Sequence, residues 1–274
     1  FPLHGWLPTA HPVAPAPASA VLSGVITKSG VLGIIRVVYY IAGPRLIRGS
    51  WVQTVWMILT LTTVFMGSML AYKEHVLKKR LAYSTVSQVS YILFGLSLLE
   101  PTGFVGALSH VIFHSLVKNA LFMSAGAVIF CTGWTKVEQM KGLGRVMPKM
   151  LACYTLVSLT LVGIPPTSGF ISKWYLAQGA LSSETGVFTW LGPVILLISA
   201  LLTAGYLFPL TIQGFFPGTD FSDEELRKRG LLGREPSRLM LVPVLVLTVG
   251  AVLFGCFPTP LLSFLQAVAG TVFG

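Results

Sequence analysis

Residues 107–130 read ALSHVIFHSLVKNALFMSAGAVIF, a nearly continuous apolar stretch that contains three ionisable side chains. These are His110, His114 and Lys118, spaced four residues apart. Positions four apart fall on one stripe of an α-helix, because each residue turns the helix by about 100°. About 20 apolar residues are enough to cross a bilayer. The stretch therefore predicts a membrane helix with a line of protonatable groups along one face.

The rest of the chain has the composition of a membrane protein. Of its 274 residues, 54% are hydrophobic and 10% are charged, whereas a typical soluble domain is about 25% charged. Five apolar runs are each about long enough to cross a bilayer: 17–41, 51–72, 81–99, 103–131 and 238–256. They are too many and too long for a signal peptide. We predict an all-α, polytopic transmembrane bundle. Because the chain opens on Phe1 and FPLHGWLPTAH, without a charged leader, we expect a C-terminal piece of a longer protein.

The net charge of +10 is distributed unevenly among the loops. Lysines and arginines number four, four and five in three loops: 73–80, 133–149 and 213–238. The alternate loops contain only Arg45 and Arg48. Because basic residues accumulate on the cytoplasmic side, the three basic loops are predicted to be cytoplasmic, which requires 149–213 to cross the membrane twice. The charge thus reflects topology, and no nucleic-acid partner is expected.

The three cysteines, Cys131, Cys153 and Cys256, are isolated and form no CxxC pair. This spacing supports neither a zinc nor an iron–sulfur site. We expect small buried residues at these positions, and no metal or cofactor.

Two segments interrupt the helical pattern. Residues 8–17, PTAHPVAPAP, contain four prolines, and residues 163–169, GIPPTSG, contain two prolines and two glycines. Irregular backbone at membrane depth persists only where protein buries it or where it lines a watery cavity, and interrupted helices often hold the ion sites of transporters. We predict two discontinuous helices, whose similar order of residue types hints at an internal repeat. For GIPPTSG, a plain extramembrane turn is an equal alternative.

Ionisable residues inside the apolar runs are the strongest functional signal. Lys28 lies in the middle of the first run and Lys173 follows the GIPPTSG break, while all nine acidic residues lie outside the uninterrupted runs. A charge at the centre of a membrane helix costs at least about 2.5–3.5 kcal/mol. Lysine in a low dielectric releases its proton more readily, and histidine titrates near neutral pH. We predict a proton relay made of Lys28, His110, His114, Lys118 and Lys173.

Structural roles are the alternative for these residues. A lysine near a helix end extends its ammonium to the headgroups, and a single histidine often serves as a hydrogen-bonded core group. Ser84, Ser87, Gln88 and Tyr91 share one helix face, which suits either a hydrated path or helix packing. Gln53 is a further candidate for the hydrated path. Haem ligation does not fit, because two histidines one turn apart cannot occupy both axial positions of one haem, and no other apolar run contains a histidine.

Five motifs follow one another in an order that resembles a known family: PLHGWLPTAH, GVITKSGVLGIIR, KKRLAYSTVSQVSYILFGL, SHVIFHSLVKNALFMSAG and GIPPTSGFISKWYL. The chain is similar, over residues 1–215, to antiporter-like membrane subunits. This family includes the proton-pumping subunits of respiratory complex I (NADH:quinone oxidoreductase), the large subunits of Mrp-type sodium/proton antiporters, and their equivalents in membrane-bound hydrogenases.

The resemblance implies inverted repeats, each containing a broken helix: residues 1–41 would form the first and 169–213 the second. Lys28 would match the family's central lysine, Lys173 its terminal residue, and the stripe on 107–130 its middle relay. A glutamate that pairs with the residue at Lys28 would lie earlier in a full-length chain.

The implied function is translocation of protons, or exchange of protons and sodium, by a subunit of a larger complex. The subunit would have no catalytic chemistry of its own and would sit in a prokaryotic cell membrane, with other membrane subunits and the lipid bilayer as partners. Residues 1–215 would form the proton-conducting domain, 216–237 a charged cytoplasmic loop, and 238–274 a C-terminal membrane helix and tail. A scaffold subunit without transport is the alternative, which the three membrane-depth lysines disfavour.

Overall fold

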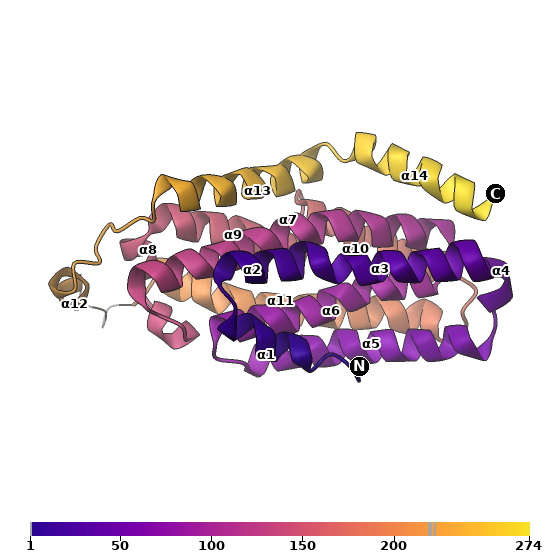
Figure 1. The fold of residues 1–274 in the computed structure, drawn as a ribbon, viewed down its shortest axis with the longest axis horizontal. Helices are drawn as coiled ribbons and strands as arrows, with labels where there is room; N and C mark the ends of the chain where they lie inside the picture. The colour runs from indigo at the N-terminus through magenta and orange to yellow at the C-terminus, as the bar shows by residue number, and fades with distance from the viewer. Residues whose placement is uncertain (1, 219–220, 222) are drawn as a thin grey trace.

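The computed structural model describes residues 2–218, 221 and 223–274, and it shows an elongated bundle of roughly parallel helices (Figure 1). No strand occurs in this part of the chain, so the predicted all-α fold is confirmed. The α-helices are α1 (Trp6–Val13), α2 (Ala16–Val21), α3 (Thr27–Ile35), α4 (Pro44–Ile47), α5 (Trp51–Lys73), α6 (Leu77–Ser97), α7 (Pro101–Thr132), α8 (Leu143–Val146), α9 (Pro148–Val162), α10 (Ser168–Ser182), α11 (Phe188–Phe215), α12 (Asp223–Lys228), α13 (Arg238–Cys256) and α14 (Thr259–Phe273). The π-helical segment η1 (Leu22–Ile26) joins α2 to α3, and a second one, η2 (Arg36–Ala42), extends α3, so that the four form one long helix. The segment η3 (Val137–Met140) is a 3₁₀ turn.

Five segments of the described chain are long and apolar enough to cross a membrane: Ala16–Ala42, Trp51–Lys73, Pro101–Thr132, Phe188–Phe215 and Arg238–Cys256. Four correspond to predicted apolar runs. The predicted run 81–99 belongs to α6, which is almost wholly buried between its neighbours. Phe188–Phe215 was expected only as one of two crossings within 149–213.

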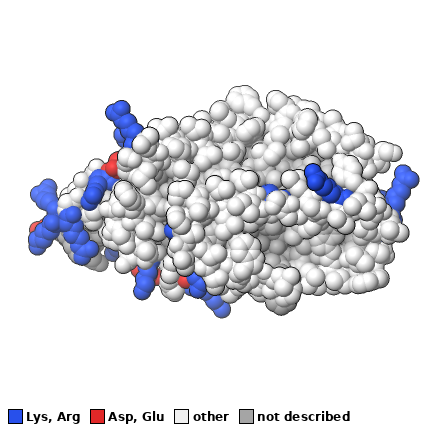
Figure 2. All heavy atoms as spheres, viewed as in Figure 1, with Lys and Arg blue, Asp and Glu red and all other residues white. Residues whose placement is uncertain are grey.

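The three basic loops lie together at one end of the bundle, here called the charged end, where Figure 2 shows most of the visible lysines and arginines. Val76 and Lys136 form an antiparallel bridge between the first two loops. Arg145 Nη1 lies 3.3 Å from Asp223 Oδ2, which joins the second loop to the third. The predicted grouping is therefore confirmed, and the cytoplasmic side stays a prediction. Asp220, in the third loop, lies outside the described residues.

The first interruption differs from the expectation. In Figure 1, α1 runs toward the charged end and the helix from α2 to η2 runs back from it. The turn at Ala14–Pro15 lies at that end, because Lys78 Nζ from the first turn of α6 donates to Ala14 O at 2.9 Å. The prolines of 8–17 thus form a short helix and an end turn. They do not interrupt the backbone at the middle of a single helix over 1–41.

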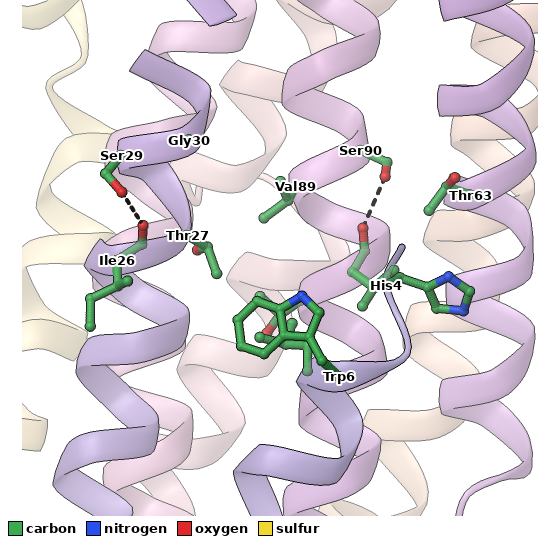
Figure 3. Close-up of a pocket in the computed structure, with 12 residues that line it drawn as sticks. His4, Trp6, Ile26, Thr27, Ser29, Gly30, Thr63, Val89 and Ser90 are labelled. Atoms are coloured by element: carbon green, nitrogen blue, oxygen red, sulfur yellow. Dashed lines mark hydrogen bonds between the residues drawn. The ribbon is translucent and has the colours of Figure 1, made fainter. Parts of the chain in front are cut away.

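The residues just before α1 lie beside the segment that carries Lys28. Residues 2–5 form no helix, and α1 begins at Trp6. His4 and Trp6 line a cavity of about 420 Å³ together with Thr27 and Ser29, the two neighbours of Lys28 in sequence (Figure 3). This turn therefore lies at the level of Lys28.

The second interruption is a genuine break within one crossing. Helices α9 and α10 follow each other along the bundle and are separated by residues 163–167, with Gly163 in the left-handed region at φ 91° and a cis bond between Pro165 and Pro166. Helix α11 then returns to the charged end as an uninterrupted span (Figure 1). The broken helix is accordingly 148–182, and the expected bounds of 169–213 were wrong.

Apolar packing is divided into two clusters along the bundle. One cluster lies toward the charged end and includes Leu81, Phe122 and Leu151. The other lies toward the opposite end and includes Phe94, Phe104 and Leu176. On α7 the second cluster ends at Ala107 and the first begins at Val117. His110 and His114 therefore lie between the two apolar clusters, and Lys118 lies at the edge of the first.

Candidate functional site

The stripe of α7 is buried as a unit. His110, His114 and Lys118 are 2%, 1% and 0% exposed. The two imidazole rings are stacked, with centroids 5.8 Å apart and planes inclined by 19°. The histidines therefore point in the same direction, as their spacing predicts.

Lys118 lies among polar groups from three other positions in the bundle. Its Nζ donates to Ser84 Oγ at 2.8 Å and to Leu81 O at 3.0 Å, both on α6. Ser84 Oγ also accepts a hydrogen bond from Tyr206 OH of α11 at 2.7 Å. Ser84 was predicted from the sequence and Tyr206 was not, since its only signal is that a buried tyrosine hydroxyl usually needs a partner.

His110 connects α7 to α6 and α10. Its Nδ1 lies 2.9 Å from Ser172 Oγ and its Nε2 lies 3.2 Å from Gln88 Oε1. The ring also stacks on Tyr91, with centroids 5.7 Å apart. Since both ring nitrogens have hydrogen-bond partners in the protein, neither is available to ligate a haem iron.

Lys173 occupies the break between α9 and α10. Its Nζ donates to Leu161 O at 2.7 Å and to Val162 O at 2.8 Å, two carbonyls that the end of α9 leaves without intrahelical partners. The negative end of a helix dipole favours a cation there. The ammonium lies 5.3 Å from the ring centroid of Tyr91, within cation–π range. The residue is partly exposed, but its charged group is surrounded by protein, so it faces the bundle as predicted.

Lys28 is 5% exposed and donates to Ser23 O within the π-helical segment η1. Single π-helical turns frequently mark functional sites, because they leave backbone groups without regular partners. Ser23 Oγ is 2.7 Å from Thr85 Oγ1 on α6. Thr85 Oγ1 in turn donates to Leu81 O, the carbonyl that also accepts from Lys118. Ser23 and Thr85 thus link Lys28 to Lys118, and the sequence analysis missed both.

His114 lies at the centre of this arrangement. Neither of its ring nitrogens has a hydrogen-bond partner among the described residues, although both are buried. Lys28, Lys118, His110 and Lys173 all lie within electrostatic range of its ring. A buried polar group without a partner requires an explanation. The position of His114 among four other protonatable groups offers such an explanation.

No carboxylate forms an ion pair with Lys28, Lys118 or Lys173 within the described residues. The ion pairs His75–Glu138, Lys79–Glu74 and Arg145–Asp223 involve residues at the charged end. The hydrogen bond from His75 holds the pKa of the Glu138 carboxyl below its ordinary value. The membrane-depth lysines are therefore stabilised here by carbonyl and hydroxyl oxygens.

The remaining predicted residues divide into two groups. Ser87 joins a buried hydroxyl cluster, since Ser68 Oγ lies 2.8 Å from Ser87 Oγ and 2.6 Å from Ser199 Oγ. Gln53 instead serves the end of the bundle opposite the charged end, where its Nε2 donates to Ser97 O at 2.9 Å. The structure does not bring Gln53 together with the lysines.

Fold and site together define a class of integral membrane bundles in which an interrupted helix and buried lysines share one centre. The chain belongs to the NADH:quinone oxidoreductase/Mrp antiporter transmembrane family, because the sequence model of that family matches residues 1–203. The family resemblance drawn from the five motifs is therefore confirmed.

Individual relatives come from several membrane complexes. NADH-quinone oxidoreductase subunit N of Desulforudis audaxviator is 36% identical over 271 residues, which cover 96% of this chain and 52% of that protein. Formate hydrogenlyase subunit 3 of Escherichia coli is 33% identical, covering 97% of this chain and 45% of that protein. In structure, a chain of the Mrp complex from Dietzia sp. DQ12-45-1b superposes with a TM-score of 0.86 at 24% identity, covering all of this chain and 56% of that chain, which supports the fold. This chain thus spans about half the length of the curated relatives it matches.

Proposed function

We propose that the chain is the proton-conducting part of an antiporter-like subunit that works within a larger membrane complex of the prokaryotic cell membrane. One observation supports this above all. Buried ionisable groups from α10, α7 and α3 form the series Lys173, His110, His114, Lys118 and Lys28. Tyr91 contacts both Lys173 and His110, the two imidazole rings stack, and Ser23 and Thr85 join Lys118 to Lys28. The names of the relatives, which include oxidoreductase and hydrogenlyase subunits, support a larger complex.

The chemistry of the series suits stepwise proton transfer. An imidazole accepts a proton on one nitrogen and releases one from the other, so His110 and His114 relay without changing their net charge. The two rings are stacked neighbours on the stripe, with centroids 5.8 Å apart, and water molecules at their nitrogens would carry the proton from one ring to the next. Because like charges oppose each other's protonation at close range, a proton arriving at one lysine promotes release from the next.

Protons fit this site better than sodium ions. Hard cations prefer carboxylate, carbonyl and water oxygens, whereas the centre described here is occupied by lysine ammonium and imidazole groups. A scaffold role fits less well, because each buried lysine costs at least about 2.5–3.5 kcal/mol and an apolar residue at its position would avoid that cost.

The test is proton flux through the full-length subunit in its complex, reconstituted in vesicles and driven by an imposed membrane potential. Lys118→Ala should leave assembly intact and reduce flux by about 100-fold or more, since a positioned proton-transfer group contributes about 10²–10⁴-fold. Lys118→Arg should not restore flux, because arginine does not release its proton. Lys141→Ala, at an exposed loop lysine, is the matched control. Normal flux in a normally assembled Lys118→Ala complex would refute the proposal.

A further inference from the structure

His11, on α1, is a buried histidine that the relay described above does not use. It is 0% exposed, and neither ring nitrogen has a hydrogen-bond partner in the described chain. Its ring stacks on Phe122, with centroids 4.5 Å apart and planes inclined by 17°. Ser19 Oγ donates to His11 O at 3.1 Å, which ties the backbone of α1 to α2. The stack fixes the ring in place while leaving both nitrogens free.

The position of this ring extends the stripe of α7. Phe122 follows Lys118 by four residues, so it is the next position on the face that carries the two histidines. Phe122 itself cannot transfer a proton, but α1 places an imidazole directly against it. Lys118 and Lys78 are the two charged groups close enough to act electrostatically on the His11 ring.

Lys78 continues this line to the surface at the charged end. It is 9% exposed, and its Nζ donates to Ala14 O, three residues beyond His11. Lys78 also lines a cavity of about 490 Å³. That cavity extends to the surface of the bundle, because it is also lined by Phe130 and Leu239, which are 78% and 89% exposed.

We infer that His11 is a proton-transfer residue that connects Lys118 with Lys78, so that the proton path opens at the charged end beside the turn between α1 and α2. A proton from Lys78 or its hydration shell binds one nitrogen of His11, and the other nitrogen releases a proton toward Lys118. The ring ends the cycle in its initial charge state. This inference rests on the proposed function of the relay.

Two substitutions at position 11 separate proton transfer from packing. His11→Phe keeps a ring on Phe122 and removes both nitrogens, whereas His11→Lys keeps a protonatable group and removes the ring. If His11 transfers protons, His11→Phe should reduce flux about tenfold or more, and His11→Lys should retain more flux than His11→Phe. If His11 only packs against Phe122, the order should reverse. His75→Phe is the matched control, because the His75 side chain is 72% exposed at the same end.

The measurement uses the full-length complex in liposomes that contain a trapped pH dye, with a potassium diffusion potential as the driving force. Lys118→Ala is measured in parallel. Normal flux in His11→Phe with lost flux in Lys118→Ala would overturn the role of His11 and leave the relay standing, whereas normal flux in both would refute the relay itself. If His11→Phe does not assemble, His11→Gln takes its place: lost flux at normal assembly supports the inference, and normal flux overturns it.

Discussion

The two proline-rich segments of this chain look alike in sequence and occupy different depths in the bundle. At 8–17 the chain forms α1 and turns back at Ala14–Pro15, at the charged end. At 163–167 it breaks between α9 and α10 and continues in the same direction (Figure 1). In both places a lysine amine donates to carbonyls that the end of a helix leaves free: Lys78 to Ala14 O, and Lys173 to Leu161 O and Val162 O.

The difference shows that prolines indicate where a helix stops but do not indicate how deep it stops. At the charged end, free backbone groups also have loops and water nearby. In the middle of the bundle they must be satisfied within the protein, which places a cation at membrane depth. There, beside Tyr91 and near His110, the cation becomes a candidate for transport.

The largest expected effect tests whether Lys173 does more than satisfy these carbonyls. Lys173→Ala should reduce proton flux by about 100-fold. Lys173→Arg keeps a cation at the end of α9 but does not release its proton, so the complex should assemble and flux should stay low. The two measurements are proton flux in vesicles and the yield of assembled complex. High flux in Lys173→Arg would leave Lys173 with only the structural role of satisfying the carbonyls at the end of α9.

A smaller effect compares Gly163, in the second region, with Gly5, which lies just before the first. Gly163→Ala should destabilise the protein by about 1–2 kcal/mol, because Gly163 has a positive φ of 91° that side chains disfavour. An added Cβ would also approach Lys173 Cδ to 3.0 Å. Gly5→Ala should change stability by less than about 0.5 kcal/mol, since Gly5 has an ordinary helical φ and nothing within 4 Å of an added Cβ. Thermal unfolding of the purified complex measures this contrast, and equal shifts for both variants would contradict it.

The smallest effect concerns which side of the membrane the charged end faces. Lys141→Cys at that end and Glu184→Cys at the other, both at exposed positions, should leave flux unchanged in a background with the exposed Cys256 replaced by serine. A membrane-impermeant thiol reagent added to intact cells should label position 184 and spare position 141, because basic loops remain in the cytoplasm. The reverse labelling would invert the assigned topology and place the opening beside His11 on the outside.

The sequence by itself determined the class of fold, most of the spans and the grouping of the basic loops. These follow from properties that each segment carries alone: apolar length, loop charge, and the four-residue spacing on α7 that places three groups on one face. The five ordered motifs likewise identify the family without reference to the fold. The depth of the first interruption and the bounds of the broken helix 148–182 could not be read in this way, because proline restricts the backbone identically wherever it lies.

Only the tertiary structure decided which polar groups meet. Ser23 and Thr85 lie 62 residues apart in sequence, as do His110 and Ser172, and nothing local in either segment specifies the partner. The same holds for His11, which the sequence shows only as part of a proline-rich motif and which packing places against Phe122. Hydrogen bonds between helices at membrane depth form only where distant parts of the chain bring donors and acceptors together, so the connections between helices in the site are a property of the assembled bundle.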